Sequence, residues 1–283
     1  MAYTQIGKTV NAKVDVSKTN PRSVVKRSIT IEGSRCLQRE YAVYRALYSK
    51  LTPRQRMRFA FVPSPLQRDK RTGSVGIVLK KLGSDLFHWR TTAAKRRESA
   101  VLSIERLIIL FHAIHSLEIV HQAGFVHNDL KPENMCVGAT VSDPLHSQFK
   151  LYIIDFGYAT SAGRFMSFGK GTLDFSSVNA MIGDKHTTHW DDMESLVYTF
   201  VDIFNGRLKW EEYDTKKVLL SKRSMSAAAI CEKAPQCLCD ILTSIRARRR
   251  DKTRCHEIDY SWMKSAILKD LRALGFDQPL YLA

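Results

Sequence analysis

Two short acidic motifs constrain this chain more strongly than any other feature of its sequence. The first is the octapeptide His127–Asn134, and the second is Asp155–Gly157, which follows an apolar stretch. Transfer of a γ-phosphoryl group to a hydroxyl requires a carboxylate that orients the hydroxyl and accepts its proton, together with carboxylate or amide oxygens that hold magnesium against the phosphates. Asp129 fits the first role, while Asn134 and Asp155 fit the second. The two motifs therefore predict a phosphoryl-transfer site.

The spacing inside the first motif supports this prediction. The step from Asp129 to Asn134 is typical of a loop that carries the catalytic base and a magnesium ligand together, and Lys131 between them can place a positive charge beside the transferring phosphate. Residues 149–154 read as a strand that separates the two motifs. At these motifs the chain resembles the eukaryotic protein-kinase family, and a lysine at the position of Lys131 is typical of its serine/threonine branch. The resemblance implies ATP and Mg²⁺ as cofactors, with Asn134 and Asp155 as the magnesium ligands.

Local patterns predict short strands in the first part of the chain and helices afterwards. Strands are expected at Ser23–Lys26 and Gly76–Leu79, each of which follows turn-forming residues. Apolar and aromatic residues spaced along one helix face predict a helix over Leu37–Tyr48. Further helices are expected over Ser103–His121 and Asp191–Phe204.

The order of these elements agrees with the resemblance. The chain has no repeats, low-complexity tracts or long Gly/Ser/Pro linkers, so one compact unit is expected. The kinase family implies an α+β bilobal fold, with a small β-rich N-lobe over residues 1–82 and a larger helical C-lobe over residues 83–283. The whole chain is then expected to form a single protein kinase domain.

The same resemblance assigns nucleotide-binding roles to residues outside the two motifs. Lys26, at the end of a short strand, takes the place of the lysine that grips the α- and β-phosphates, and Glu40 on the following helix is expected to point back at it. Leu79 is expected to line the back of the adenine pocket, and backbone groups of Lys80 and Leu82 to meet the adenine edge. The nucleotide-binding set implied in this way is Ile6, Gly7, Val14, Val24, Lys26, Glu40, Leu79, Lys80, Leu82, Cys136 and Ile154.

Three later segments resemble one group within that family, the casein kinase 1 and vaccinia-related kinases. They are Gly171–Asn179, where most kinases carry Ala-Pro-Glu, the helix start His189–Leu196, and Gly206–Trp210 at the end of that helix. The resemblance implies that Thr172 hydrogen-bonds the catalytic loop and that Asp192 braces the backbone of this loop. The residues implied to stack into a spine between the lobes are His127, Phe156 and Tyr44. The catalytic set implied in this way is Asp129, Lys131, Asn134 and Thr172.

The phosphate-covering loop departs from the family pattern. Where that loop usually reads Gly-x-Gly-x-x-Gly, the segment Ile6–Val14 keeps only Gly7. Glycine serves there because backbone amides must approach phosphate closely and adopt unusual dihedral angles. We therefore expect weaker ATP binding, which the charge of Lys8 or Lys13 partly offsets.

Two further departures concern regulation and the hinge between the lobes. Asn128 replaces the arginine that captures an activation-loop phosphate in many kinases, which argues against regulation through phosphorylation of Thr160, Ser161 or Ser167. Lys80-Lys81 stands where the casein kinase 1 group usually has an acidic residue. We expect it to add positive charge near the ribose and to alter nucleotide preference.

The excess of basic residues limits the kinds of partner. The formal net charge is +16, and the densest basic patches are Lys95–Arg97 and Arg246–Arg254. Such a field favours acidic or phosphorylated protein substrates, chromatin-associated targets, nucleic acid or anionic surfaces. The first patch fits a solvated helix face. The second fits a nuclear-localisation patch and an anion site equally well, so direct nucleic-acid binding stays open.

Targeting and cysteine patterns indicate an intracellular protein that is cytoplasmic, nuclear or both. The N-terminus lacks a basic-then-apolar signal, and polar residues interrupt the most apolar stretch, Leu107–Val120, so no membrane span is expected. The six cysteines are irregularly spaced, which argues against a disulfide framework. The group Cys231, Cys237, Cys239 and Cys255-His256 lacks a standard zinc spacing, so we expect free thiols.

Three functions compete at this point. The first is an ATP- and magnesium-dependent serine/threonine protein kinase, since all the polar residues of the predicted site are retained. The second is a pseudokinase or weakly active binding protein, in which the glycine-poor loop marks lost turnover. The third is a small-molecule phosphotransferase, because His-Asn-Asp-Leu loops occur there too. Lys131 and the segment from Gly171 to Leu196 weigh against this third function.

Overall fold

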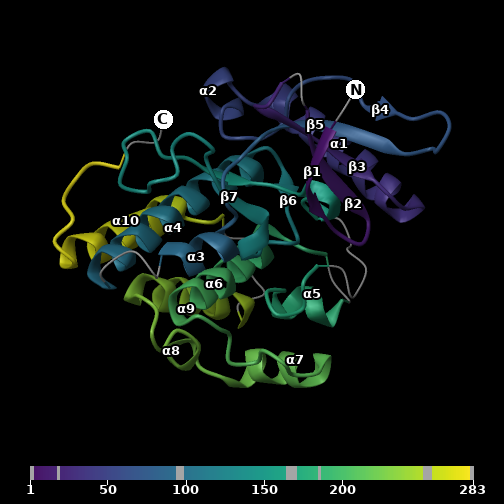
Figure 1. Cartoon of the computed structure of the whole chain (residues 1–283). Helices are drawn as coiled ribbons and strands as arrows, with labels where there is room; N and C mark the ends of the chain where they lie inside the picture. Colours follow the sequence, from purple (N-terminus) through teal and green to yellow (C-terminus); the bar gives the residue numbers. More distant parts are fainter. Residues whose placement is uncertain are drawn as a thin grey trace.

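The structure is a computed structural model that describes residues 3–17, 20–93, 99–163, 171–183, 186–250 and 257–280. It has two parts that follow each other along the chain (Figure 1). The N-terminal part is a five-stranded sheet with one long helix, and the C-terminal part is mainly helical. The predicted two-part α+β architecture is therefore confirmed.

The sheet is antiparallel throughout, in the order β1-β2-β3-β5-β4. The register places Val14 opposite Lys26 and Lys26 opposite Ile77, so the lysine lies at the centre of the sheet. The strands predicted at Ser23–Lys26 and Gly76–Leu79 are both present. The bounds are β1 (Tyr3–Lys8), β2 (Ala12–Ser17), β3 (Ser23–Ser28), β4 (Gln67–Arg68) and β5 (Val75–Lys80).

Helix α1 (Ile31–Lys50) packs on this sheet and is followed by the short α2 (Pro53–Arg56). It begins where the side chain of Thr30 accepts a hydrogen bond from the Gly33 amide, which satisfies one free helix N–H group. Its buried residues follow a helical spacing and lie on one face of the helix, as the sequence predicted. They include Leu37, Glu40, Val43, Tyr44 and Leu47.

The C-terminal part begins after β5 and joins eight helices to short strands and turns among the described residues. Its helices are α3 (Leu86–Ala93), α4 (Ser99–Gln122), α5 (Val178–Ile182), α6 (His189–Asn205), α7 (Thr215–Ser224), α8 (Ala227–Ile230), α9 (Gln236–Arg250) and α10 (Tyr260–Ala273). The short elements are β6 (Phe125–Val126), η1 (Pro132–Asn134), β7 (Met135–Val137), β8 (Leu151–Ile153), η2 (Phe156–Tyr158) and β9 (Thr160–Ser161). Because β6 pairs with β9 and β7 with β8, the two sequence motifs are brought together.

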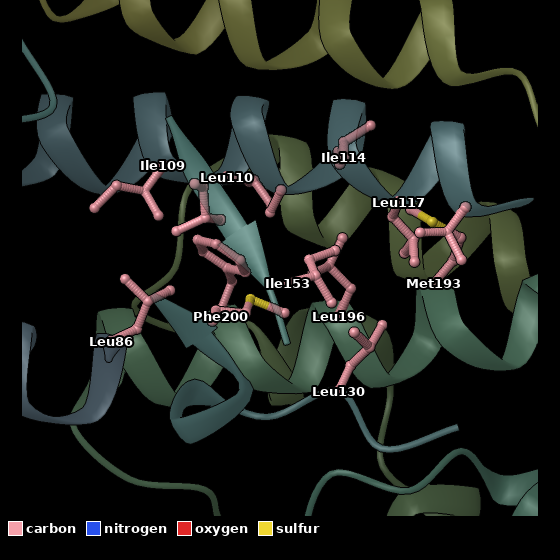
Figure 2. Packing of buried hydrophobic residues seen from close by; sticks show 14 of the residues in the cluster. Leu86, Ile109, Leu110, Ile114, Leu117, Leu130, Ile153, Met193, Leu196 and Phe200 are labelled. Atoms are coloured by element: carbon pink, nitrogen blue, oxygen red, sulfur yellow. The ribbon is translucent and has the colours of Figure 1, made fainter. Parts of the chain in front are cut away.

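Helices α4 and α6 form the centre of the C-terminal part. Figure 2 shows apolar side chains of α4, including Leu110 and Leu117, facing Leu196 and Phe200 of α6, with Ile153 of β8 between them. Helix α4 is long and apolar enough to cross a membrane by length and composition, but 67% of its most apolar window is buried. No other helix of the described residues meets that criterion. Packing in the core therefore accounts for its apolar sequence.

The cysteines and the basic patches noted in the sequence form no additional structural feature among the described residues. Cys36, Cys136, Cys231, Cys237 and Cys239 are free thiols. The described residues contain no cluster of three or more His, Cys, Asp or Glu side chains that would hold a metal ion. The structure does not describe Cys255, His256, the patch Lys95–Arg97 or residues 251–254 of the second basic patch.

Candidate active site

Asp129 is the centre of a compact polar cluster in the loop between β6 and β7. One carboxylate oxygen, Oδ1, accepts hydrogen bonds from the backbone N–H and the hydroxyl of Thr172, both at 3.0 Å. The other, Oδ2, accepts one from Asn134 Nδ2 at 3.0 Å and lies 3.4 Å from Lys131 Nζ. The same Nζ donates to the Thr172 hydroxyl at 2.7 Å. The other three residues predicted as catalytic thus all contact the Asp129 carboxylate and hold it in one orientation.

Asn134 and Asp155 present oxygen atoms suited to a magnesium ion. The two N–H groups of Asn134 Nδ2 are used by the backbone carbonyl of Asp129, at 2.8 Å, and by its carboxylate, which leaves Oδ1 without a partner among the described residues. The Asp155 side chain is 40% exposed. Carboxylate and amide oxygens are the protein ligands that magnesium prefers, with phosphate and water completing its shell. The residues present therefore fit the ion.

Asp155 adopts an unusual backbone conformation for its residue type. Its φ and ψ angles are 64° and 68°, in the left-handed region, and the Gly157 amide donates to its Oδ1 at 3.4 Å. Aspartate tolerates this region because its short side chain hydrogen-bonds locally, but the conformation is still disfavoured. Such strain concentrates at functional sites, where surrounding contacts maintain it.

Lys26 joins the sheet to this site. Its Nζ lies 2.8 Å from Glu40 Oε2 on α1 and 2.9 Å from Asp155 Oδ1, so the contact expected between Lys26 and Glu40 is present. Burial opposes the charge of Lys26, but the two carboxylates outweigh it and raise the pKa of the lysine above its ordinary value. Burial likewise opposes the charge of Asp155, and Lys26 outweighs it and lowers the pKa of that carboxyl. Both groups are therefore charged at neutral pH.

The buried carboxylate of Asp192 on α6 holds the backbone of the catalytic loop. Its Oδ2 accepts hydrogen bonds from the His127 amide at 2.6 Å and from His121 Nε2 at 3.0 Å, and its Oδ1 accepts one from the Asn128 amide at 2.8 Å. This is the bracing that the sequence led us to expect. Hydrogen bonds to a charged acceptor are stronger than neutral ones, so the backbone of the loop that carries Asp129 is rigidly held.

Aromatic rings connect the start of the catalytic loop to the N-terminal part. The ring centroids of His127 and Phe156 are 4.8 Å apart, and those of Phe156 and Tyr44 are 5.0 Å apart, both in edge-to-face geometry. Tyr44 also stacks on Phe61 at 5.1 Å. The expected spine between the two parts is therefore present, and it extends one ring further than predicted.

Asn128 links the catalytic loop to the segment that follows Asp155. Its Nδ2 lies within hydrogen-bonding distance of the Tyr158 carbonyl and of Thr160 Oγ1, at 3.0 Å in both cases. Its φ angle of 68° lies in the left-handed region, which asparagine tolerates better than most residues. The sequence indicated only that an arginine had been lost here. The asparagine makes direct contacts of its own, while Ser167 lies outside the described residues.

The glycine-poor loop between β1 and β2 is a tight turn fastened to the start of α1. Within the turn, the Thr9 amide donates to the Ala12 carbonyl at 2.7 Å, and the Ala12 amide donates to the Thr9 hydroxyl at 3.1 Å. Across to the helix, the Asn11 carbonyl accepts from the Ile29 amide at 3.0 Å, and Asn11 Oδ1 accepts from the Thr30 hydroxyl at 2.9 Å. Side-chain bonds hold this turn where the family uses glycine.

Gly33 permits that close approach. A Cβ atom added to Gly33 would lie 2.1 Å from the Asn11 carbonyl oxygen, well inside contact distance. No signal in the sequence linked Gly33 to Asn11, because the pairing depends on how α1 packs against the sheet.

The residues predicted to line the adenine side come from adjacent strands. Val24 pairs with Leu79, and Gly7 pairs with Val14, while Ile6 occupies a bulge in β1 and is 54% exposed. Val24 and Leu79 are buried. The strand register therefore brings these side chains to one region of the sheet next to Lys26.

The hinge after β5 completes that region. The Gly83 amide donates to the Val137 carbonyl at 2.9 Å, which places the hinge beside β7 and the buried Cys136. The Leu82 amide has no hydrogen-bond partner within the described part of the chain. Lys80 is half-buried, and burial together with the charge of Lys150 lowers its pKa. The partly buried Ile154 follows β8, whose Ile153 pairs with Met135 on β7.

Arg39 makes a contact with the second motif that we did not predict from the sequence. Its Nη1 donates to the Gly157 carbonyl at 2.9 Å and so ties α1 to the second motif. The only signal was its place next to Glu40 on the same helix, which is too common a pattern to be informative.

Comparison with known proteins gives one matching family, described as Protein kinase domain, which matches residues 77–254. Three relatives illustrate the closer similarities. Casein kinase 1-like protein HD16 of Oryza sativa subsp. japonica is 35% identical over 144 residues, which are 46% of this chain and 19% of that protein. Casein kinase I homolog 2 of Schizosaccharomyces pombe is 24% identical over 219 residues, 70% of this chain and 47% of that protein. A probable casein kinase I homolog of Encephalitozoon cuniculi is 26% identical over 220 residues, 71% of this chain and 66% of that protein. The chain thus spans less than two thirds of the length of each.

Proposed function

The chain belongs to the protein kinase family, with its similarity in the casein kinase 1 group, and we propose that it transfers the γ-phosphate of ATP to serine and threonine hydroxyls of proteins. One observation carries this proposal. Asp129 is held by Thr172 and Asn134 beside the ammonium of Lys131, and this cluster lies next to the ion pair of Lys26 with Asp155. A chain without catalytic duty has no need to keep this whole set of polar contacts.

The residues act mainly by positioning and by charge. The Asp129 carboxylate accepts the proton of the substrate hydroxyl, and the bonds from Thr172 and Asn134 hold it in the orientation that this step requires. Lys131 places positive charge beside the transferring γ-phosphate. Lys26 places positive charge beside the α- and β-phosphates. Asn134 and Asp155 would hold magnesium, which would neutralise phosphate charge. Fixed charges in a preformed site lower the barrier because they need no reorganisation during the reaction.

The hinge supports ATP as the nucleotide. The unpartnered amide of Leu82 and the carbonyl of Lys80, whose own amide donates to the Ala60 carbonyl at 2.6 Å, can pair with the adenine edge between buried Leu79 and Cys136. Buried polar groups of a ligand gain most from donors that have no other partner. The side chains of Lys80 and Lys81 add charge near the ribose.

For the protein substrate we propose acidic or already phosphorylated sequences, including chromatin-associated proteins. The support is the net charge of +16, which attracts acidic partners and disfavours basic ones. We place the protein inside the cell, in the cytoplasm, the nucleus or both.

The alternative is a pseudokinase that binds partners without turnover. The glycine-poor turn favours it, because Asn11 is fastened to Thr30 and Ile29 and has less freedom to adapt to phosphate. A thermal shift with ATP and magnesium tests nucleotide binding separately from catalysis, since a ligand of the folded state must raise stability.

The decisive experiment is γ-phosphate transfer from ATP with magnesium, measured for autophosphorylation and with casein and a basic protein as acceptors. Wild type is compared with Lys26→Ala and Asp129→Asn. Transfer that both variants lose supports the kinase. A wild type that shifts thermally with ATP but transfers nothing supports the pseudokinase.

A further inference from the structure

Lys222 on α7 is a buried lysine whose partners are backbone carbonyls rather than a carboxylate. It is only 1% exposed, and its Nζ donates hydrogen bonds to the Leu173 carbonyl at 2.9 Å and to the Ser176 carbonyl at 2.7 Å. Met181 Sδ lies 3.7 Å from the same nitrogen. One ammonium group therefore holds both ends of the segment 173–176.

Two aromatic rings complete the surroundings of this ammonium. Nζ lies 4.9 Å from the ring centroid of Tyr198 and 5.1 Å from that of Trp210, within the range of a cation–π interaction. Trp210 also donates from Nε1 to the Asp174 carbonyl at 2.9 Å. Lys222 and Trp210 together bind three of the four carbonyls of segment 173–176.

The position of this segment gives the contacts their meaning. It follows Thr172 directly, and Thr172 holds the Asp129 carboxylate through two hydrogen bonds. Residues 171–176 are all partly exposed, so an acceptor protein reaching Asp129 meets them. The segment is thus fixed at one end by the predicted base and along its length by Lys222 and Trp210.

Burying the charged ammonium of Lys222 costs free energy. Burial lowers the pKa of Lys222 to about 7, although the charge of Asp174 acts in the opposite direction. The other groups facing Lys222 are the neutral phenol of Tyr198 and the guanidinium of Arg246, which donates to the Lys222 carbonyl at 2.7 Å. A methionine would fill the same space without this cost, because its side chain is unbranched and apolar. A buried lysine is therefore retained for what its three donors bind.

We propose that Lys222 is a positioning residue, which sets the conformation of segment 173–176 so that this segment receives the acceptor protein next to Asp129. The inference rests on the proposed kinase function and extends it to the binding of the protein substrate. Trp210 acts on the same segment through the Asp174 carbonyl. Neither side chain contacts the residues predicted to bind ATP in the described structure, so their effect falls on the acceptor and not on the nucleotide.

The test compares wild type with Lys222→Met in steady-state kinetics, using whichever of casein or a basic protein the wild type phosphorylates. We expect KM for the acceptor protein to rise about tenfold, as the loss of two charge-assisted hydrogen bonds and a cation–π contact implies. KM for ATP should stay at the wild-type value. Lys216→Met is the matched control, because Lys216 is an exposed lysine of the same helix, and it should change neither constant.

A second variant guards against a folding defect. Trp210→Phe keeps an aromatic ring beside Lys222 and removes the N–H that binds the Asp174 carbonyl, together with one ring of the buried indole. It should raise the acceptor KM in the same direction by a smaller factor. In the double variant the rise in acceptor KM should be smaller than the product of the two single-variant factors, because both side chains act on one segment. If Lys222→Met does not fold, Trp210→Phe carries the kinetic test alone.

Hydrogen exchange gives a reading that does not depend on turnover. The amides of Phe175 and Ser176 donate to the Thr172 carbonyl at 3.1 and 3.0 Å, and they should exchange faster in Lys222→Met but not in Lys216→Met. A lower melting temperature with unchanged acceptor KM and unchanged exchange at these amides overturns the inference. A wild type without any transfer overturns the proposed function instead, and exchange then still decides the role of Lys222.

Discussion

The ammonium of Lys26, at the centre of the sheet, lies 2.9 Å from the carboxylate of Asp155, which follows β8 in the C-terminal part. The same ammonium pairs with Glu40 on α1 at 2.8 Å. The two parts of the molecule are therefore joined by a charged contact at the predicted phosphate site and by the ring stack of Tyr44, Phe156 and His127 behind it.

Removing the cation at this junction should abolish transfer. In Lys26→Met the Asp155 carboxylate loses its partner and the phosphates lose a positive charge, so kcat/KM should fall by about 100-fold or more. Lys70→Met, at an exposed turn of the same sheet, is the control and should behave as wild type. Phosphate transfer measured on both variants checks this, and near-normal activity of Lys26→Met would contradict the assigned role.

Gly33→Ala should weaken nucleotide binding from outside the predicted pocket. The new Cβ would meet the Asn11 carbonyl oxygen at 2.1 Å, so the β1–β2 turn must move away from α1. We expect the Kd for ATP with magnesium to rise about tenfold, equivalent to about 1.4 kcal/mol. Titration calorimetry measures it, with the exposed Gln38→Ala on the same helix as control. Equal affinities in all three proteins would mean that the turn does not contribute to binding.

Asn128 should hold the segment after Asp155 in place without phosphorylation. Asn128→Ala loses the contacts of Nδ2 with Tyr158 and Thr160, and its alanine must also adopt a φ angle of 68°. The free energy of unfolding should therefore be about 1–3 kcal/mol lower than in wild type. Asn128→Gly accepts that φ angle and isolates the hydrogen-bond loss. Denaturant unfolding measures both variants. Phosphatase treatment of the wild type should leave transfer unchanged, and lost transfer would instead indicate regulation by phosphorylation.

Lys222 should make stability depend on pH in a defined direction. Its pKa is about 7 in the folded chain against 10.5 for an ordinary lysine, so between these values the unfolded chain binds more protons than the folded one. Under that condition the free energy of unfolding rises with pH. The difference in unfolding free energy between wild type and Lys222→Met should therefore shift in favour of wild type from pH 7 to pH 9. Denaturant titrations at the two pH values measure the shift, and a constant difference would show that Lys222 does not titrate there.

Much of the fold and of the site was predictable because the signals are local. The helices around Leu37–Tyr48 and Asp191–Phe204 follow from apolar spacing along the chain, and the strand that carries Lys26 follows from β-branched residues after a turn. The catalytic loop is a continuous motif, so Asp129, Lys131 and Asn134 were predicted from their residue types and spacing. Glu40, Thr172 and Asp192 required the family resemblance, and each makes the contact that the resemblance implied.

Other contacts had no local signal. Asn11 meets Gly33 only because α1 packs against the sheet at one angle, and Arg39 reaches Gly157 only because the two parts close on each other. Lys222 reads in the sequence as one more basic residue of a charged helix. Its burial depends on Met181 of α5, Tyr198 of α6 and Trp210, which surround its ammonium.

The sequence by itself determined the kinds of chemistry available, because short-range spacing decides which carboxylate, amide and ammonium groups share one loop or one helix face. The tertiary structure alone decided which of these groups meet, which charges are buried, and which backbone segments are held. Those properties arise from contacts between residues far apart in the chain. Packing creates them, and no window of neighbouring residues encodes packing.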